Sequence, residues 1–177
     1  MKTANATRLD SGKIVETADG LMDGYNVTVG GLQKSFDQIL ATSKATGTGF
    51  DTINNSLGAF APIAQELNIP LSETLAIFRG FDASGVSIDK GATALTKGLT
   101  SLLNPSTKAA ETLNRLGIRQ SEVFTGDGKL KSLTGLMGLL AKRGATTGDM
   151  VEIFGNKAGV QLSRLLSQGE GALRGYA

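Results

Sequence analysis

Apolar residues recur along this chain at intervals of three and four positions, and hardly ever at intervals of two. This spacing puts them on one face of an α-helix, whereas a half-buried β-strand requires alternation. The clearest case begins after Ser87, a residue type that favours the N-cap of a helix, and ends at Asn104-Pro105. The apolar residues of this stripe are Ile88, Ala92, Leu95, Leu99, Leu102 and Leu103. The pattern predicts an all-α protein.

The same period extends over most of the remaining chain. Pro105 is expected to begin a second helix that Gly117 ends, because proline suits the first helical turn and glycine the residue after the last. Pro70 is likewise expected near a helix start. Further helical stretches are predicted at residues 29–40, 60–67, 71–78, 130–142, 150–154 and 160–166. The segments ADGLMDGYNVTVGG (18–31) and SKATGTGF (43–50) are predicted to form turns.

Glycine is unusually frequent, with 24 of 177 residues. Gly91 and Gly98 fall inside one predicted helix, and Gly135 and Gly138 inside another; each should cost about 1 kcal/mol relative to alanine. One interpretation is that these glycines let helices approach closely or mark helix breaks. The other is that the chain is kept weakly stable so that it can be unfolded and threaded. Either way, we expect a compact bundle of short helices with Gly and Pro breaks.

The stretch FTGDGKLKSL, residues 124–133, could be a calcium loop, a phosphate loop or a plain connection. A calcium loop needs oxygen ligands at alternate positions, but Lys129 and Lys131 stand at two of them. A P-loop needs four residues between its glycines and Ser or Thr after its lysine. We therefore predict a tight turn in which Asp127-Gly128 supplies the positive φ values, forming one small β-turn or hairpin near residues 123–131.

The chain contains no Cys, no His and no Trp. Thiolate nucleophiles, imidazole bases and the usual zinc ligands are therefore excluded. The 16 acidic residues are scattered, and although two of them could still converge after folding, no pair is marked as catalytic. We expect no enzyme activity and assign no catalytic, cofactor-binding or metal-binding residue. With 18 basic residues and a net charge of +2, the chain is too balanced to indicate sequence-specific nucleic-acid binding.

Length and hydrophobic content allow one domain with an extension: 177 residues, of which 40% are hydrophobic. We predict an N-terminal helical and loop extension over 1–47, a helical core module over 48–168 and a C-terminal end over 169–177. The abrupt end GALRGYA leads us to expect a chain truncated from a longer protein. No apolar run is long enough to span a bilayer, and the start MKTANATRLDSG lacks the apolar stretch of a signal peptide.

The order of elements over residues 49–167 resembles the core region of phage tail tape-measure proteins of the lactococcal-phage TP901 type. The shared features are an Ile-Pro link, a G-x-x-L-x-x-x-L helix, the break NPSTKAA, the stop LGI, the turn FTGDGK and an IFG near the end. No one of these is specific, but six in the same order is a strong match. This chain has Gly91-Ala92 where the family more often has Ala-Gly. The difference replaces one small residue with another, so we expect the close helix contact to be kept.

This resemblance implies a structural and assembly role in the tail of a phage or prophage. Such proteins are long helical chains that lie in the lumen of the tail tube, set its length and leave through it when DNA is ejected. The implied partners are other copies of the chain in a homo-oligomer, the tail-tube protein and the tail assembly chaperones. The chain would be made in the cytoplasm of the bacterial host. The family assigns no catalytic residue.

Two other classes of function stay open at this stage. A membrane-active helical module would help the genome across the host envelope, making transient membrane contact through an amphipathic helix such as residues 130–141. Core packing accounts for the same apolar face. A cell-wall hydrolase would need a catalytic Glu, a metal site or a cysteine, and no acid here stands in a recognisable catalytic setting.

Overall fold

The computed structural model describes residues 11–168, and the expected end segment 169–177 lies outside these residues. Within 11–168 the chain forms ten α-helices and one 3-10 turn, with an isolated β-bridge as the only strand-like pairing. The all-α prediction is confirmed. In chain order the elements are α2 (Ser11–Tyr25), η1 (Val29–Gly31), α3 (Leu32–Thr46), α4 (Phe50–Leu67), α5 (Leu71–Ala83), α6 (Ile88–Leu103), α7 (Thr107–Arg115), α8 (Gln120–Val123), α9 (Leu133–Lys142), α10 (Thr147–Phe154) and α11 (Asn156–Leu166).

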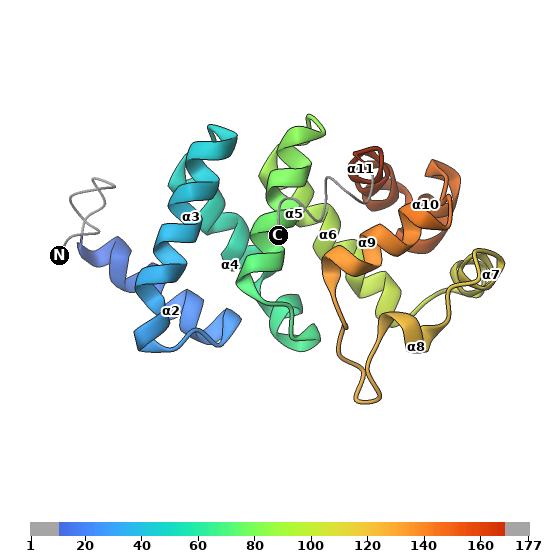
Figure 1. Cartoon of the computed structure of the whole chain (residues 1–177), viewed down its shortest axis with the longest axis horizontal. Helices are drawn as coiled ribbons and strands as arrows, with labels where there is room; N and C mark the ends of the chain where they lie inside the picture. Colours follow the sequence, from blue (N-terminus) through green and yellow to red (C-terminus); the bar gives the residue numbers. More distant parts are fainter. Residues whose placement is uncertain (1–10, 169–177) are drawn as a thin grey trace.

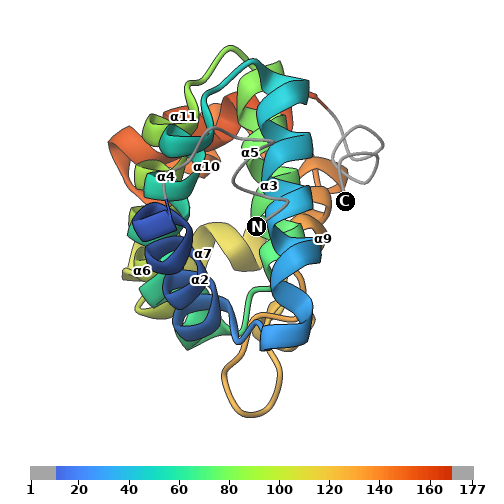
Figure 2. The ribbon, with the colours of Figure 1, turned by 90° about the vertical axis from the view of Figure 1, so that its left-hand side faces the viewer.

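The helices are stacked along one axis in two layers (Figures 1 and 2). Helices α2, α4, α6 and α11 pack in that order to form the first layer, and α3, α5 and α9 form the second. Through α6 the chain crosses from one layer to the other at every connection. Helices α7, α8 and α10 lie at the end opposite α2, and α11 then returns to pack against α6.

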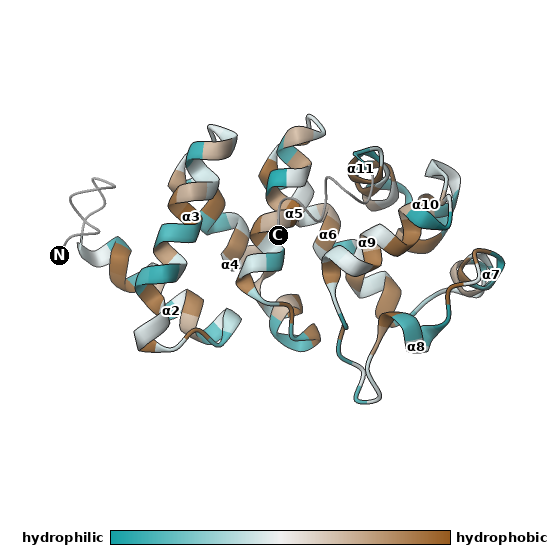
Figure 3. Ribbon diagram, viewed as in Figure 1, coloured by the Kyte–Doolittle hydropathy of each residue, from teal (hydrophilic) through white to brown (hydrophobic). Residues whose placement is uncertain are grey.

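The hydrophobic core runs between the layers without interruption from Leu21 to Leu166. Its largest fully buried side chains include Phe60, Phe78 and Phe154. Figure 3 shows that the helices carry both apolar and polar residues, as amphipathic helices of a packed bundle should. The predicted stripe of α6 is buried except for Leu103, which is partly buried. The core contains residues from both sides of residue 47, so α2 and α3 share it with the rest of the chain. The predicted domain boundary at residue 47 stays a prediction.

The prediction of turns at residues 18–31 and 43–50 is wrong for most of the first segment and part of the second. Helix α2 continues to Tyr25, and α3 continues to Thr46 before Gly47 takes a left-handed conformation with φ of 68°. Gly24 signalled a turn, but a Cβ there would lie 2.5 Å from the Cβ of Ala61 in α4. This glycine permits a close contact between two helices, which overrides its low helix propensity.

Two predicted helix starts are also wrong, by two or three residues. Helix α7 begins at Thr107 because the Ser106 side chain accepts a hydrogen bond from the Ala109 N–H at 3.2 Å, which makes Ser106 the N-cap. Helix α9 begins at Leu133, where Ser132 caps the Gly135 N–H at 2.9 Å. Leu113 of α7 and Leu116, which follows the helix, are partly buried against the core.

The hairpin predicted near 123–131 is present. Phe124 and Leu130 form an antiparallel bridge, and the Thr125 N–H donates to the Lys129 carbonyl at 2.8 Å. Within residues 123–131 only Gly128 has a positive φ, of 80°, so the expectation that Asp127 also has one is wrong. A two-residue type I′ turn needs two residues with positive φ, whereas a three-residue loop such as 126–128 needs one.

Glycines inside the helices mark the closest crossings. A Cβ on Gly91 of α6 would lie 2.4 Å from the Phe81 ring of α5, and one on Gly98 would lie 2.9 Å from Leu162 of α11. A Cβ on Gly159 of α11 would lie 2.4 Å from the Met150 carbonyl oxygen of α10. Gly135 is exposed and meets only the Ser132 cap of its own helix. Close approach therefore accounts for Gly91 and Gly98, and not for Gly135.

Gly159→Ala should destabilise the fold by about 2–3 kcal/mol, because the added methyl group meets backbone that cannot rotate away. Gly20→Ala is the matched control, since Gly20 also lies inside a helix but a Cβ there meets nothing within 4 Å. We expect it to stabilise by about 0.5–1 kcal/mol through helix propensity. Urea unfolding of the two variants measures both, and equal effects would contradict the close-packing role of Gly159.

Candidate functional site

Acidic side chains are among the groups that could carry chemistry in a chain without Cys or His, and their surroundings show how they are used. Glu73 of α5 lies at the N-terminus of α9. Its carboxylate accepts hydrogen bonds from the Leu133 N–H at 2.7 Å and from the hydroxyls of Ser132 at 2.5 Å and Thr134 at 3.2 Å. A carboxylate in this position satisfies a free N–H and complements the helix dipole. Glu73 therefore joins α5 to α9.

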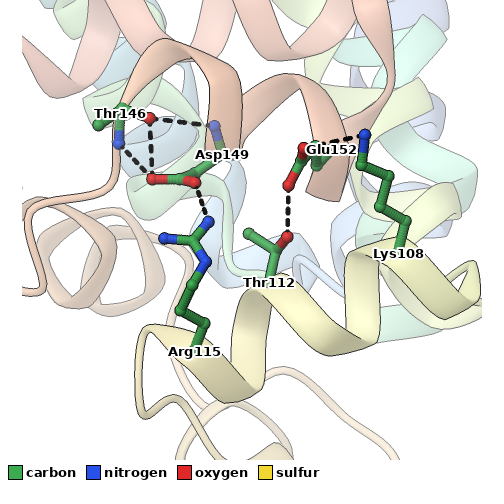
Figure 4. A network of polar contacts seen from close by, with 6 residues as sticks. All are labelled: Lys108, Thr112, Arg115, Thr146, Asp149 and Glu152. Carbon is green, nitrogen blue, oxygen red and sulfur yellow. Dashed lines mark hydrogen bonds and ion pairs between the residues drawn. The ribbon is translucent and has the colours of Figure 1, made fainter.

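A larger set of polar residues joins α7 to α10, and we call it the α7–α10 network (Figure 4). The Glu152 carboxylate of α10 accepts a hydrogen bond from the Thr112 hydroxyl at 2.5 Å and forms an ion pair with Lys108 at 3.0 Å. The Asp149 carboxylate forms an ion pair with Arg115. The network consists of Lys108, Thr112, Arg115, Thr146, Asp149 and Glu152.

Asp149 has a second role at the start of α10. Its carboxylate accepts from the Thr146 N–H at 2.8 Å, and the Asp149 N–H donates to the Thr146 hydroxyl oxygen at 3.2 Å. This reciprocal pair is a capping box. Only 6% of Asp149 is exposed, so the carboxylate that receives the Arg115 guanidinium is shielded from water on its other side.

The network favours the charged forms of both acids. The hydrogen bond from the Thr146 N–H, helped by the Arg115 guanidinium, holds the pKa of Asp149 below its ordinary value. The Thr112 hydroxyl and then Lys108 lower the pKa of Glu152. Neither acid is set up to act as a proton donor near neutral pH, because a general acid needs a raised pKa. The two carboxylates hold helices together.

Helix α7 has little apolar attachment to the rest of the molecule. Only Ala109 and Thr112 of this helix are buried. A groove of about 190 Å³ adjoins it, lined by apolar residues that include Leu102, Leu113 and Ile118. The hydrogen bonds and ion pairs of the α7–α10 network therefore add to the apolar contacts that hold α7.

The hairpin also proves to be a structural element. The Leu130 N–H donates to the Leu67 carbonyl at 3.0 Å, and the Lys129 ammonium donates to the Glu66 carbonyl at 2.7 Å. These carbonyls lie at the C-terminal end of α4, where free acceptors attract a cation. The Lys129 ammonium is thus held by a backbone carbonyl of α4. In the part of the chain that the structure describes, no cluster of three or more acidic side chains is arranged to hold a metal ion.

Sequence reasoning assigned no site residue, and it missed the α7–α10 network. The signal for one part was present, because Thr146 and Asp149 have the spacing of a capping box. The pairs between α7 and α10 join residues 34 to 44 positions apart and have no local signature.

Asp149→Asn should lower the free energy of unfolding by about 1–2 kcal/mol, because the ion pair to Arg115 and the charge in the capping box are lost together. Urea unfolding at pH 7 checks this. Asp82→Asn, on the exposed surface of α5, is the matched control and should change stability by less than about 0.5 kcal/mol. If the two variants are equally stable, the network does not hold α7.

The difference in stability between the wild type and Asp149→Asn should depend on pH. The pKa of Asp149 is lowered from its ordinary 3.8 in the folded state, so its contribution is complete above that value and is lost as the pH falls through the folded pKa. Thermal unfolding from about pH 2 to pH 6 should show the two melting temperatures converging at the acid end. A constant gap would contradict the lowered pKa.

Comparison with known protein families gives one match. The family described as phage-related minor tail protein matches over residues 1–168. Neither a comparison with curated proteins nor one with solved structures gives a match.

Proposed function

This chain belongs to the phage-related minor tail protein family, and on that premise we propose that it is a segment of a tail tape-measure protein. In this proposal it sets the length of the tail during assembly and is released through the tail tube when DNA is ejected. Membership of the family makes the chain a structural component of the phage tail. The ruler function and the position in the tube lumen are the proposed steps beyond that.

The observation that carries the proposal is the family match together with the order of elements in residues 49–167. That order resembles the core of tape-measure proteins, and its elements have clear structural roles. Asn104 ends α6, Gly117 follows α7 with a φ of 66°, and residues 124–130 form the hairpin. The Gly and Pro breaks divide the chain into short helices that are stable only when packed.

The proposal assigns the chain no catalytic activity. It is supported by the positions of Glu73, Asp149 and Glu152, whose carboxylates are engaged in hydrogen bonds that join helices. The proposed partners are other copies of the chain, tail-tube subunits and tail assembly chaperones. Sequence-specific binding of nucleic acid is not part of the proposed role.

A membrane-active module has less support. The apolar residues of α9 that would face lipid, Leu133, Leu136, Met137 and Leu140, are at most 3% exposed, so the bundle would have to open first. Among the described helices, none combines the length and the apolar character needed to cross a bilayer.

A ruler acts through its length, and the folded and extended forms of this segment differ widely in length. As one continuous helix, residues 49–167 would span roughly 180 Å at about 1.5 Å per residue. In the stacked form, α4, α6 and α11 of the first layer advance by about 8–10 Å each, or about 30 Å together. The proposal therefore requires the bundle to open when the chain enters the tube.

An in-frame deletion of residues 49–167 from the phage gene should shorten tails by roughly 180 Å, measured by electron microscopy. A tandem duplication of the same residues is the matched control and should lengthen tails by the same amount. Changes of about 30 Å would mean that the segment stays folded in the tail. Tails of unchanged length in both strains would contradict the ruler function of this segment.

A further inference from the structure

A groove of about 500 Å³ runs between α6 and α11 on the first layer. Its apolar part is formed by Ala94, Ala158 and Val160, of which the two alanines are buried. Three lysines line it as well: Lys90 and Lys97 on α6, and Lys157 on α11. The groove is thus an apolar strip bordered by positive charge, which suits an amphipathic helix with acidic residues beside its apolar ones.

The three lysines have no ion pair within residues 11–168. Asp89 is the acidic residue that lines the same groove. A side-chain hydrogen bond with Ser87 at the start of α6 holds the pKa of Asp89 below its ordinary value, so it is charged but engaged. The groove keeps an excess of positive charge.

A matching surface lies on α2 at the other end of the first layer. Its exposed residues include Glu16, Asp19 and Asp23, and none of these carboxylates has an ion pair within the described residues. Val15 lies among them and is 59% exposed, so it offers an apolar side chain between the acidic ones. Gly20 is also exposed on α2 and has no side chain, so a neighbouring helix can approach closely there.

The charges on the two surfaces have the same spacing. Glu16 and Asp23 are seven residues apart on α2, as Lys90 and Lys97 are on α6, which is about 10.5 Å along a helix in each case. Aligning Glu16 with one of these lysines and Asp23 with the other therefore brings both pairs of opposite charges into register.

We propose that α2 of one copy lies in the α6–α11 groove of a second copy. Within one copy α4 lies between α2 and α6, so α2 does not reach its own groove (Figure 1). The contact joins two different surfaces and therefore repeats from copy to copy, giving a head-to-tail assembly. This inference rests on the proposed self-association for its partner and is independent of the ruler function.

Sedimentation velocity of the full 177-residue chain tests the contact. The wild type should self-associate with increasing concentration at about 50 mM salt and dissociate at about 500 mM, since exposed charges are screened. The groove variant Lys90→Glu/Lys97→Glu and the helix variant Glu16→Lys/Asp23→Lys should each associate at least about tenfold more weakly. Circular dichroism verifies that both variants remain helical.

Mixing the two variants gives the sharper test. The acidic α2 of the groove variant meets the basic groove of the helix variant, and the reverse contact is also complementary. Association should therefore return in the mixture although it is lost in each variant alone. The matched control is Lys34→Glu/Lys44→Glu on exposed positions of α3, which has the same change in net charge and should associate like the wild type.

A wild type that stays monomeric, a control variant as impaired as the groove variant, or a mixture that fails to associate would each overturn the proposal. If the monomeric wild type instead bound a synthetic acidic helical peptide, the groove would belong to a different protein partner. Normal self-association with unchanged tail length in the deletion strain would refute the ruler function and leave this contact intact.

Discussion

The stacking of the helices depends on crossings at which a glycine lets one helix pack directly against its neighbour. At Gly91 the Phe81 ring occupies the place of a side chain, and at Gly159 the backbone of α10 does so. Short helices gain little stability from their own hydrogen bonds and depend on such contacts. The high glycine content, which lowers helix propensity, is at these crossings the condition for tight packing.

Polar contacts add to the apolar core at two places. Glu73 connects α5 to the start of α9, and the α7–α10 network connects α7 to the end of the stack. The two kinds of attachment differ physically, because exposed ion pairs are screened by salt and are lost when the acid is protonated, whereas apolar burial involves no titrating group. The attachment of α7 to α10 is thus expected to weaken with rising salt and at acidic pH.

These features bear on how a tail protein of this kind could work. A bundle of short helices can be stable when the helices are packed together. When such a bundle opens, the chain can separate into individual helices at its glycine and proline breaks. The first layer also carries two unlike surfaces, with exposed acidic residues on α2 and lysines along the groove between α6 and α11. If the acidic surface of one copy binds the basic groove of the next, as proposed above, copies add in one direction and form a linear assembly.

The sequence by itself determined the all-α class, the buried stripe of α6, the stop at Gly117 and the turn at residues 124–130, because helical period and cap residues act over a few positions. It misassigned residues 18–25, because a glycine at a helix crossing and a glycine in a turn look alike in a sequence. Only the tertiary structure decided that Gly24 meets Ala61 and that Arg115 meets Asp149. Such contacts join residues 34 or more positions apart, and their partners are chosen by the packing of whole helices instead of by local pattern.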